Sequence, residues 1–579
     1  MLAARMQKKQ WVIEPAEKSR DEFAKSLKVS LLLAQVLINR QITDTETAKI
    51  FLQPKLTDLI APEKTPGIEK AVQRISKAVK DKEKVTVYGD YDVDGITGVA
   101  ILWQLLTMLG VDVDFYIPHR IDEGYGLNAD AIRSLAKTGT KLLITVDCGA
   151  GAIESAQLAD QLGIELIITD HHQFGPELPK AFAIVHPALE PAYSNQNASG
   201  SMVAFKLAWA VANEFNSGTK LQPQLRDFML NATSLAAMGT IADVVDLRGE
   251  NRVLTSYGLK TLPKCQHCGI DALIESAGLT GQGLDSFHIG FRLAPMLNAA
   301  GRMGHARLAV ELLTTESPTR AKQIAEYLKE QNDQRRTCER KIFKQACEMI
   351  VQQGLNHPDR KSIVLACDQW HTGVIGIVAS RVIDKFYRPT ILINTANGIA
   401  QGSARSIEGF DLLKAISTCS EYLNTFGGHK MAAGITLDAQ NIPMFAQQLE
   451  NYAGEHLNYD DIVAKLNIDA VTSLEAFNKL MVTQLQMLEP FGRGNPEPVF
   501  ATMAVQLASA PRRVGAKGDH LQLAVTDRTA AIRCIGFRMG KLEKKLLEHE
   551  HFNIAYHVQL NTFNGNTNIQ LVLKDVRFE

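Results

Sequence analysis

The chain has 579 residues, of which 45% are hydrophobic and 22% are charged. This length is too great for one hydrophobic core and predicts three or four domains, and the composition is that of a soluble globular protein. The formal net charge of −1 excludes a strong overall attraction to nucleic acid or to anionic membranes, although an acidic cluster elsewhere would mask a basic groove in this total.

Targeting and membrane segments are not expected. The first ten residues lack the apolar core of a signal peptide, and no run of about 18 apolar residues predicts a membrane span. The eight cysteines are scattered, which is typical of a reduced cytoplasmic protein. The segment from Cys265 to Cys268 resembles half a zinc knuckle, but the next cysteine is Cys338, so structural zinc is not favoured.

Residues 1–60 are predicted to form a small helical lead-in, with a helix start at 43–46. From about residue 68 the pattern alternates between strands and helices. The predicted strands are 85–88, 111–117, 142–146, 165–169 and 183–185, and the predicted helices between them are 98–109, 128–136 and 152–162. This alternation predicts an α/β fold with a parallel sheet, in which ligands gather beyond the carboxyl ends of the strands.

Polar clusters follow four of these predicted strands. The first strand ends in Asp90, Asp92 and Asp94. One Asp would suffice to cap the following helix, whereas three crowded carboxylates repel one another and favour a bound divalent cation. The other strand ends carry His119-Arg120 with Asp122, then Asp147, and then Asp170-His171-His172.

Five residues on separate elements form the predicted metal-ligand set: Asp92, Asp94, Asp147, His171 and Asp243. Carboxylates with one imidazole suit Mn²⁺ or Mg²⁺ better than zinc. Two such ions, about 3.5–4 Å apart, activate a water and clamp a phosphodiester. Asp147 is the candidate for the carboxylate that lies between them.

The rest of the chain predicts three further parts. Ser317-Pro318 opens a long helix that ends at Gly354. A second α/β unit follows from about 361, and its loops 402–406 and 426–434 combine Gly with Ser, Arg and His in a way that suits phosphate. Five short strands after residue 500 predict a small β-barrel such as an OB-fold for single-stranded nucleic acid, with a purely structural barrel left open.

The motifs together carry a resemblance. They are Gly-Asp-Tyr-Asp-Val-Asp-Gly, Val-Asp-Cys-Gly, Asp-His-His, Ala-Asp-Val-Val, Asn-Ala-Ala-Gly-Arg, Gly-Ser-Ala-Arg-Ser and Gly-Gly-His. This set resembles the DHH phosphoesterase superfamily, and its order and the chain length resemble the RecJ family of bacterial single-strand-specific 5′-to-3′ DNA exonucleases.

The resemblance implies a domain order and an activity. It implies a helical segment (1–60), a DHH catalytic domain (61–315), a long connecting helix (316–355), a DHHA1 domain (356–455) and an OB-fold domain (456–579). The implied reaction is two-metal hydrolysis that releases 5′-mononucleotides in DNA recombination and repair. The implied partners are single-stranded DNA, a RecQ-type helicase and a single-strand-binding protein, and the implied state is a monomer.

The resemblance also assigns roles to single residues. Asp92, Asp94, Asp147, His171 and Asp243 match metal ligands, while Asp90 matches either a ligand or a residue just behind them. His172 matches the residue beside the scissile phosphate, and Asp170 would orient both histidines. The implied nucleic-acid contacts are Arg120, Ser403 and Arg405 at the 5′-phosphate, Tyr125 on the terminal base, and Arg302 and His429 on phosphates.

Two positions depart from the family pattern. His186 stands where relatives often have Asn, and Met296 stands where many have Arg, which removes one expected strand contact. Three other functions are disfavoured by the sequence. A catalytically inactive DNA-binding homologue is disfavoured by the filled ligand positions. A DHH phosphodiesterase of small substrates is disfavoured by the segment 490–579, and a pyrophosphatase by the Gly-Gly-His motif.

Overall fold

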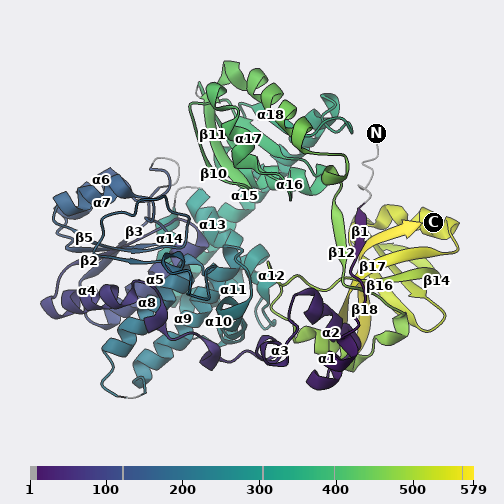
Figure 1. The fold of residues 1–579 in the computed structure, drawn as a ribbon, viewed down its shortest axis with the longest axis horizontal. Coiled ribbons are helices and arrows are strands. Elements are labelled where there is room, and N and C mark those ends of the chain that lie inside the picture. The colour runs from purple at the N-terminus through teal and green to yellow at the C-terminus, as the bar shows by residue number, and fades with distance from the viewer. Residues whose placement is uncertain are drawn as a thin grey trace. The chain divides into compact units, whose positions relative to one another are not determined.

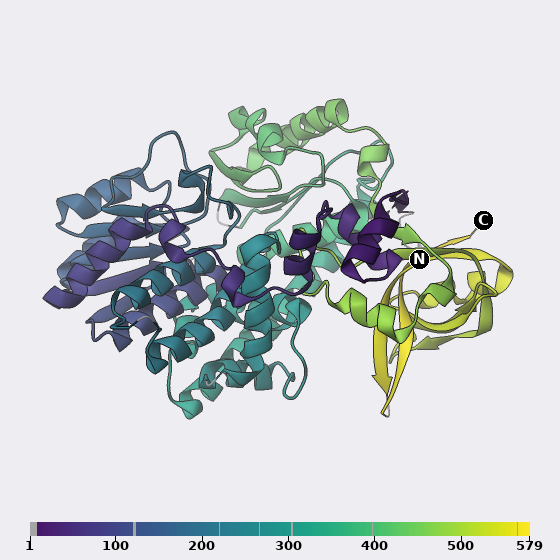
Figure 2. The same cartoon turned by 60° about the horizontal axis from the view of Figure 1, so that its bottom comes forward.

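The computed structural model describes residues 9–119, 123–218, 220–265, 267–302, 305–396, 398–563 and 565–578. Its contacts divide the chain into two units (Figures 1 and 2). The main unit comprises Ile13–Lys329 and Ile468–Glu579, and the inserted unit comprises Met1–Val12 and Glu330–Asn467. Arg120 and Asp122 lie outside the described residues. In the described part of the chain, no helix is long and apolar enough to cross a membrane.

The predicted parallel sheet is confirmed in the main unit. Its strand order is β3-β2-β4-β5-β6, and every neighbouring pair is parallel. The strands are β2 (Val85–Gly89), β3 (Val113–Tyr116), β4 (Leu142–Val146), β5 (Glu165–Thr169) and β6 (Ala183–Val185). Because all five run the same way, the polar residues that follow them gather at one edge.

Helices cover both faces of this sheet (Figure 1). One face packs on α4 (Ile68–Asp81), α5 (Val93–Met108), α8 (Gly200–Glu214) and α9 (Pro223–Ala242), and the other packs on α6 (Ala129–Lys137) and α7 (Ile153–Gln161). Alternate residues of β2 divide between the two cores, since Val87 joins the first and Tyr88 the second. Such double burial explains why these strands are continuous apolar runs.

A helical layer continues the main unit after α9. It consists of α10 (Gly249–Thr261), α11 (Cys268–Ser276), α12 (Ser286–His288), the π-helical turn η5 (Ile289–Leu293), α13 (Ala294–Arg302) and α14 (Ala306–Leu312). The elements α12, η5 and α13 follow one another without a break, so residues 286–302 form one helical run.

The predicted five-stranded barrel is also confirmed. Its strands are β14 (Phe500–Val514), β15 (His520–Thr526), β16 (Ala531–Gly536), β17 (Phe552–Phe563) and β18 (Asn566–Phe578). They pair in the order β14-β15-β16-β18-β17, and a β14–β17 pairing closes the barrel. Strands β14, β17 and β18 are longer than predicted, and register shifts within β14 and β17 interrupt the regular ladder.

The lead-in packs on this barrel. It forms α1 (Arg20–Leu27), α2 (Leu31–Asn39) and α3 (Thr45–Leu52), and the predicted start of α3 is confirmed because Asp44 caps it through a 2.8 Å hydrogen bond from Thr47 N. Phe23, Leu33 and Leu37 share a buried core with Leu485 of α19 (Lys479–Gln486) and with Phe500 of the barrel.

One buried cation joins these parts of the main unit. Arg252 of α10 is 1% exposed and stacks 3.8 Å over the ring of Phe51. Its guanidinium donates hydrogen bonds to the backbone oxygens of Phe51, Met487, Leu488 and Glu489 at 2.7–3.1 Å. Burial lowers the pKa of Arg252 to about 9. The Arg252 side chain therefore links the lead-in, α10 and the segment before the barrel through its hydrogen bonds.

The long helix α15 (Pro318–Gln352) begins where predicted, because Ser317 Oγ accepts a 3.3 Å hydrogen bond from Arg320 N. It ends just before Gly354, whose φ of +67° favours glycine. In the inserted unit, β10-β11-β9-β8-β7 form a mixed sheet. Its strands are β7 (Ile363–Cys367), β8 (Thr390–Asn394), β9 (Ile399–Arg405), β10 (Thr425–His429) and β11 (Ala432–Asp438), and its helices are α16 (Thr372–Phe386), α17 (Leu412–Ser417) and α18 (Ile442–His456).

The segment that resembles half a zinc knuckle has a structural role. His267 caps α11 by accepting a hydrogen bond from Ile270 N at Nδ1, and it donates from Nε2 to the oxygen of Leu313 at 2.7 Å. The thiols of Cys265 and Cys268 each donate to a backbone oxygen at 3.0 Å. These bonds require a neutral imidazole and occupy the groups that would bind zinc.

This arrangement predicts a pH-dependent stability. Burial lowers the pKa of His267 below its ordinary value. The unfolded chain therefore binds a proton below about pH 6.5 that the folded protein does not, and stability falls as the pH drops through that value. We expect the thermal unfolding midpoint to fall less between pH 7 and pH 5 in His267→Asn, which retains a capping side chain, than in the unsubstituted protein. Equal slopes would contradict this role.

Candidate metal centre

The acidic turn after β2 is held by the start of α5. Asp92 Oδ1 accepts hydrogen bonds from Asp94 N at 2.9 Å and Gly95 N at 3.2 Å, so α5 begins at Val93 instead of the predicted Gly98. Gly95 is required because a Cβ there would lie 2.6 Å from Asp90 O. Asp92 therefore does cap a helix, which is the alternative to a metal site that the sequence offers. The cap uses only one oxygen of one carboxylate.

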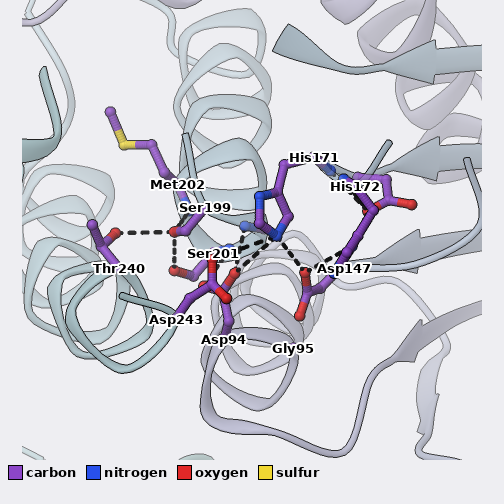
Figure 3. Close-up of polar contacts among 12 residues, drawn as sticks. Asp94, Gly95, Asp147, His171, His172, Ser199, Ser201, Met202, Thr240 and Asp243 are labelled. Carbon is purple, nitrogen blue, oxygen red and sulfur yellow. Dashed lines mark hydrogen bonds and ion pairs between the residues drawn. The ribbon is translucent and has the colours of Figure 1, made fainter. Parts of the chain in front are cut away.

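The predicted ligands are brought together from the start of α5, the ends of β4 and β5 and the end of α9, and Figure 3 shows Asp94, Asp147, His171 and Asp243 among them. Three groups have ligand atoms within 4.8 Å of one another. The groups are Asp90/Asp92/Asp147, Asp147/His171/His172 and Asp94/His171/Asp243. His171 Nε2 lies 3.1 Å from Asp147 Oδ1, 3.6 Å from Asp243 Oδ2 and 3.8 Å from Asp94 Oδ2. Asp147 and His171 each belong to two groups, which is the placement needed for a centre that holds two ions.

The chemistry of these donors fits divalent cations. Asp147 Oδ1 and His171 Nε2 are both buried, and neither has a hydrogen-bond partner among the residues that the structure describes. Burial and the neighbouring carboxylates of Asp94, Asp92, Asp90 and Asp243 raise the pKa of Asp147 well above its usual value. Burial lowers the pKa of His171, which leaves its imidazole neutral and able to bind a metal. Buried, mutually repelling carboxylates of this kind are stabilised by bound cations.

The start of α8 supports the centre and was not predicted. Asp94 Oδ2 accepts from Gly200 N at 2.5 Å, and Asp94 Oδ1 accepts from Ser201 N at 3.0 Å. Ser199 caps the helix through Met202 N and lies 3.0 Å from Thr240 Oγ1 (Figure 3). The helix N-terminus favours the carboxylate charge. The only sequence signal was a Ser-Gly-Ser at a helix start, which is common at ordinary caps.

Gly200 allows this approach. A Cβ at this position would lie 2.6 Å from Asp147 Oδ1. We therefore expect Gly200→Ala to displace Asp147 and to lower metal-dependent turnover by about 10²-fold, since displacements near 1 Å have such effects. The matched control is Gly454→Ala in α18, where a Cβ would meet nothing within 4 Å. Equal turnover in the two variants, measured at saturating metal, would refute the close packing.

His172 is positioned by Asp170 and Tyr125. Asp170 Oδ1 accepts from His172 Nδ1 at 2.8 Å, and it also accepts from the backbone N of His171 and of His172. Burial opposes the ionisation of Asp170, but its hydrogen bonds outweigh that effect and lower its pKa to about 2. Tyr125 donates from its hydroxyl to Asp147 O at 3.1 Å and stands edge-on to His172. The predicted orienting function of Asp170 agrees with this geometry.

The two departures from the family pattern are buried. His186 is 1% exposed, and its Nε2 donates to His172 O at 2.8 Å, so it supports the backbone of the histidine pair. Met296 is 3% exposed within the main hydrophobic core, so its side chain is not available to a nucleic-acid strand. On the exposed side of the same helix, Asn298 Oδ1 accepts from Val93 N at 3.1 Å, and Arg302 is the last residue of α13.

The predicted phosphate residues of the inserted unit form a group of their own. Ser403 and Arg405 lie on β9, and Arg405 Nη1 donates to Ser403 Oγ at 3.1 Å. Gly376 in α16 lets them approach, because a Cβ there would lie 2.8 Å from Ser403 Oγ and 3.0 Å from Arg405 Nη2. The first turn of a 15-residue helix beside a guanidinium suits an anion. His429 ends β10, opposite Ala432.

Comparison with known proteins identifies the family. The DHH family N-terminal domain matches residues 84–233, the DHHA1 domain matches 359–455, and the RecJ OB domain matches 468–575. The single-stranded-DNA-specific exonuclease RecJ of Bacillus subtilis is 38% identical over 99% of this chain and 71% of its own length. The chain belongs to the RecJ family.

Solved RecJ structures agree in fold. RecJ from Thermus thermophilus in complex with Mn²⁺ superposes with a TM-score of 0.84 at 30% identity, covering 98% of this chain and 80% of that one. Its complex with Mg²⁺ gives a TM-score of 0.78 at 29% identity, covering 98% and 78%. The Escherichia coli RecJ is 30% identical over 91% of this chain and 92% of its own. The RecJ fold therefore extends over both units of this chain.

Proposed function

We propose that this chain is a metal-dependent, single-stranded-DNA-specific 5′-to-3′ exonuclease that releases 5′-mononucleotides and acts in DNA recombination and repair. The observation that carries the proposal is the convergence of Asp92, Asp94, Asp147, His171 and Asp243 on one buried centre in a RecJ-family chain. The proposed cofactors are two divalent ions, Mn²⁺ or Mg²⁺, since hard oxygen donors with one imidazole suit either.

The residues divide between the two ions as follows. Asp94, His171 and Asp243 would hold one ion, Asp92 would hold the other, and Asp147 would contribute to both. Asp90 is 5% exposed and belongs to the group of Asp92 and Asp147, either as a direct ligand or directly behind one. Bound ions supply an activated water and neutralise charge on the phosphodiester and on the leaving oxygen.

The surrounding side chains position the substrate. Asp170 fixes the ring of His172 beside the ligands, where the imidazole donates to the scissile phosphate. Tyr125 stacks on the terminal base, and Arg302 and His429 contact phosphates. Arg120, Ser403 and Arg405 hold the 5′-terminal phosphate. The hydrogen bonds of Asp170 to His172 and of Arg405 to Ser403 support two of these assignments, and those of Tyr125, Arg302, His429 and Arg120 depend on the sequence.

The cellular setting is part of the same proposal. We assign a catalytic domain to 61–315, a connecting helix to 316–355, a DHHA1 domain to 356–455 and a nucleic-acid-binding barrel to 456–579, after the lead-in 1–60. The enzyme acts in the cytoplasm as a monomer on single strands produced by a RecQ-type helicase and coated by a single-strand-binding protein.

One experiment tests the activity and its direction. A linear single strand is labelled at its 5′ end or at its 3′ end and incubated with Mn²⁺, Mg²⁺ or a chelator. We expect early release of labelled mononucleotide from the 5′ end only, dependence on metal, and no digestion of a circular single strand. Release from the 3′ end or cutting of the circle would overturn the proposal.

A further inference from the structure

Two exposed aromatic rings stand on the helical run 286–302, away from the metal centre. Phe287 is 59% exposed and Phe291 is 64% exposed, and their ring centroids are 4.9 Å apart with an interplanar angle of 26°. Exposed phenylalanines in a stacked pair keep apolar surface in water that a bound ligand would cover. Such a patch, on the same helical run as Asn298 beside the acidic turn, points to a binding surface.

The pair is continuous with the metal centre along one helical run. Phe287, Phe291, Pro295, Asn298 and Arg302 are among the exposed or partly exposed side chains of this run, together with His288 and Arg292. Ile289, Leu293, Ala294, Met296 and Leu297 are buried in the main core. Pro295, Asn298 and Arg302 therefore lie on one side of α13, and the π-helical turn η5 carries Phe291 just before it.

The helical run reaches the acidic turn directly. Asn298 Oδ1 accepts the hydrogen bond from Val93 N, between Asp92 and Asp94. Gly301 lies against the same turn, since a Cβ there would be 2.5 Å from Tyr91 O. Phe291 is two helical turns before Asn298, or about 10 Å along the axis, and Phe287 is one turn farther. A strand stacked at about 3.4 Å per nucleotide would span these distances with about three to five nucleotides.

The charged side chains near Phe287 and Phe291 do not favour a charged peptide as the ligand of this surface. Phe287 lines a cavity of about 1100 Å³ whose wall carries Lys55 and Lys260 together with Asp285, Glu489 and Glu497. This mixture favours neither a strongly acidic nor a strongly basic peptide, so the choice of ligand depends on the rings and on the neighbouring metal centre. The rings themselves offer flat π-faces, which bind bases of any sequence.

Resting on the proposed function, we propose that Phe287 and Phe291 form a stacking platform for bases about three to five nucleotides from the 5′ end of the bound strand. The platform adds a second set of binding contacts to the substrate, beyond those at the cleaved nucleotide. It makes binding depend on strand length, because a dinucleotide reaches the metal centre but not the rings.

The test measures binding in chelator, where no cleavage occurs. A 5′-phosphorylated 12-nucleotide strand, either intact or abasic at positions three to five, is titrated against the unsubstituted protein, the double variant Phe287→Ala/Phe291→Ala and the double variant Phe287→Tyr/Phe291→Tyr. Phe182→Ala is the matched control, since Phe182 is an exposed phenylalanine (45%) at the start of β6. Thermal unfolding of each variant monitors the fold.

We expect the double alanine variant to bind the intact strand about tenfold or more weakly, with the tyrosine variant and the control unchanged. The abasic strand should bind the unsubstituted protein as weakly as the intact strand binds the double alanine variant. Its affinity should not fall further in the double alanine variant. Unchanged binding by the alanine variant, or a full additional loss with the abasic strand, would overturn the platform. With Mn²⁺, dinucleotide cleavage should be equal in both proteins. If the unsubstituted protein degrades no single strand with Mn²⁺, that result contradicts the proposed exonuclease function and not the platform.

Discussion

Replacement of Asp147 by Asn will abolish strand degradation, by about 10³-fold or more, and will raise the thermal unfolding midpoint of the protein in chelator. The loss follows because Asp147 belongs to both the Asp90/Asp92 group and the His171/His172 group. The gain in stability follows because, without metal, its charge is buried among four other carboxylates that raise its pKa.

Asn is the informative substitution because of the backbone. Asp147 has a φ of +63°, in the left-handed region that Asn tolerates better than other side chains with a Cβ. Asp147→Ala should be equally inactive, but backbone strain at this position would also lower the stability of that variant. The matched control is Asp130→Asn, which removes an exposed carboxylate from α6.

Two outcomes would contradict the metal assignment. One is an Asp147→Asn variant with turnover near that of the unsubstituted protein. The other is an unfolding midpoint that rises with Mn²⁺ as much in the variant as in the unsubstituted protein. Differential scanning fluorimetry with Mn²⁺ and with chelator measures this second quantity directly, because an ion that binds only the folded state stabilises it.

Arg252→Ala will destabilise the main unit by at least about 3 kcal/mol, because four backbone oxygens lose their donor in a buried site. We expect the thermal unfolding midpoint to fall by about 5 °C or more. Arg252→Lys should not restore it, since an ammonium has three donors on a flexible stem and cannot replace the planar five-donor fork.

A neighbouring arginine provides the control for that variant. Arg248 is exposed and donates one hydrogen bond to Gly494 O at 2.7 Å. Its replacement by Ala should change the midpoint little, as is usual for surface substitutions. If Arg248→Ala and Arg252→Ala lower the midpoint equally, the buried guanidinium has no special structural role.

Local patterns were sufficient to predict much of the fold. The apolar runs of β2 and β4, Ser317 before Pro318, and Asp44 before α3 act on neighbouring residues, so they can be read from the sequence. The parallel order of strands then brings Asp92, Asp147 and His171 to one edge. Together these rules predicted the sheet, the long helix and the residues of the metal centre.

Other features depend on contacts between distant segments, for which no local pattern exists. Gly200 approaches Asp147 only because α8 begins against the acidic turn. Asn298 reaches Val93 across 205 residues of chain. The predicted start of α5 at Gly98 is too late, because it follows the apolar pattern, whereas the Asp92 cap makes Asp94 and Gly95 helical as well.

The packing of the lead-in on the barrel has a consequence during synthesis. Phe23, Leu33 and Leu37 leave the ribosome early, but their partners in the barrel follow roughly 450 residues later, which takes about 20–90 s at usual rates. Throughout that interval these side chains have no native surface to cover them. The main unit therefore completes its folding only after the last strands of the barrel emerge.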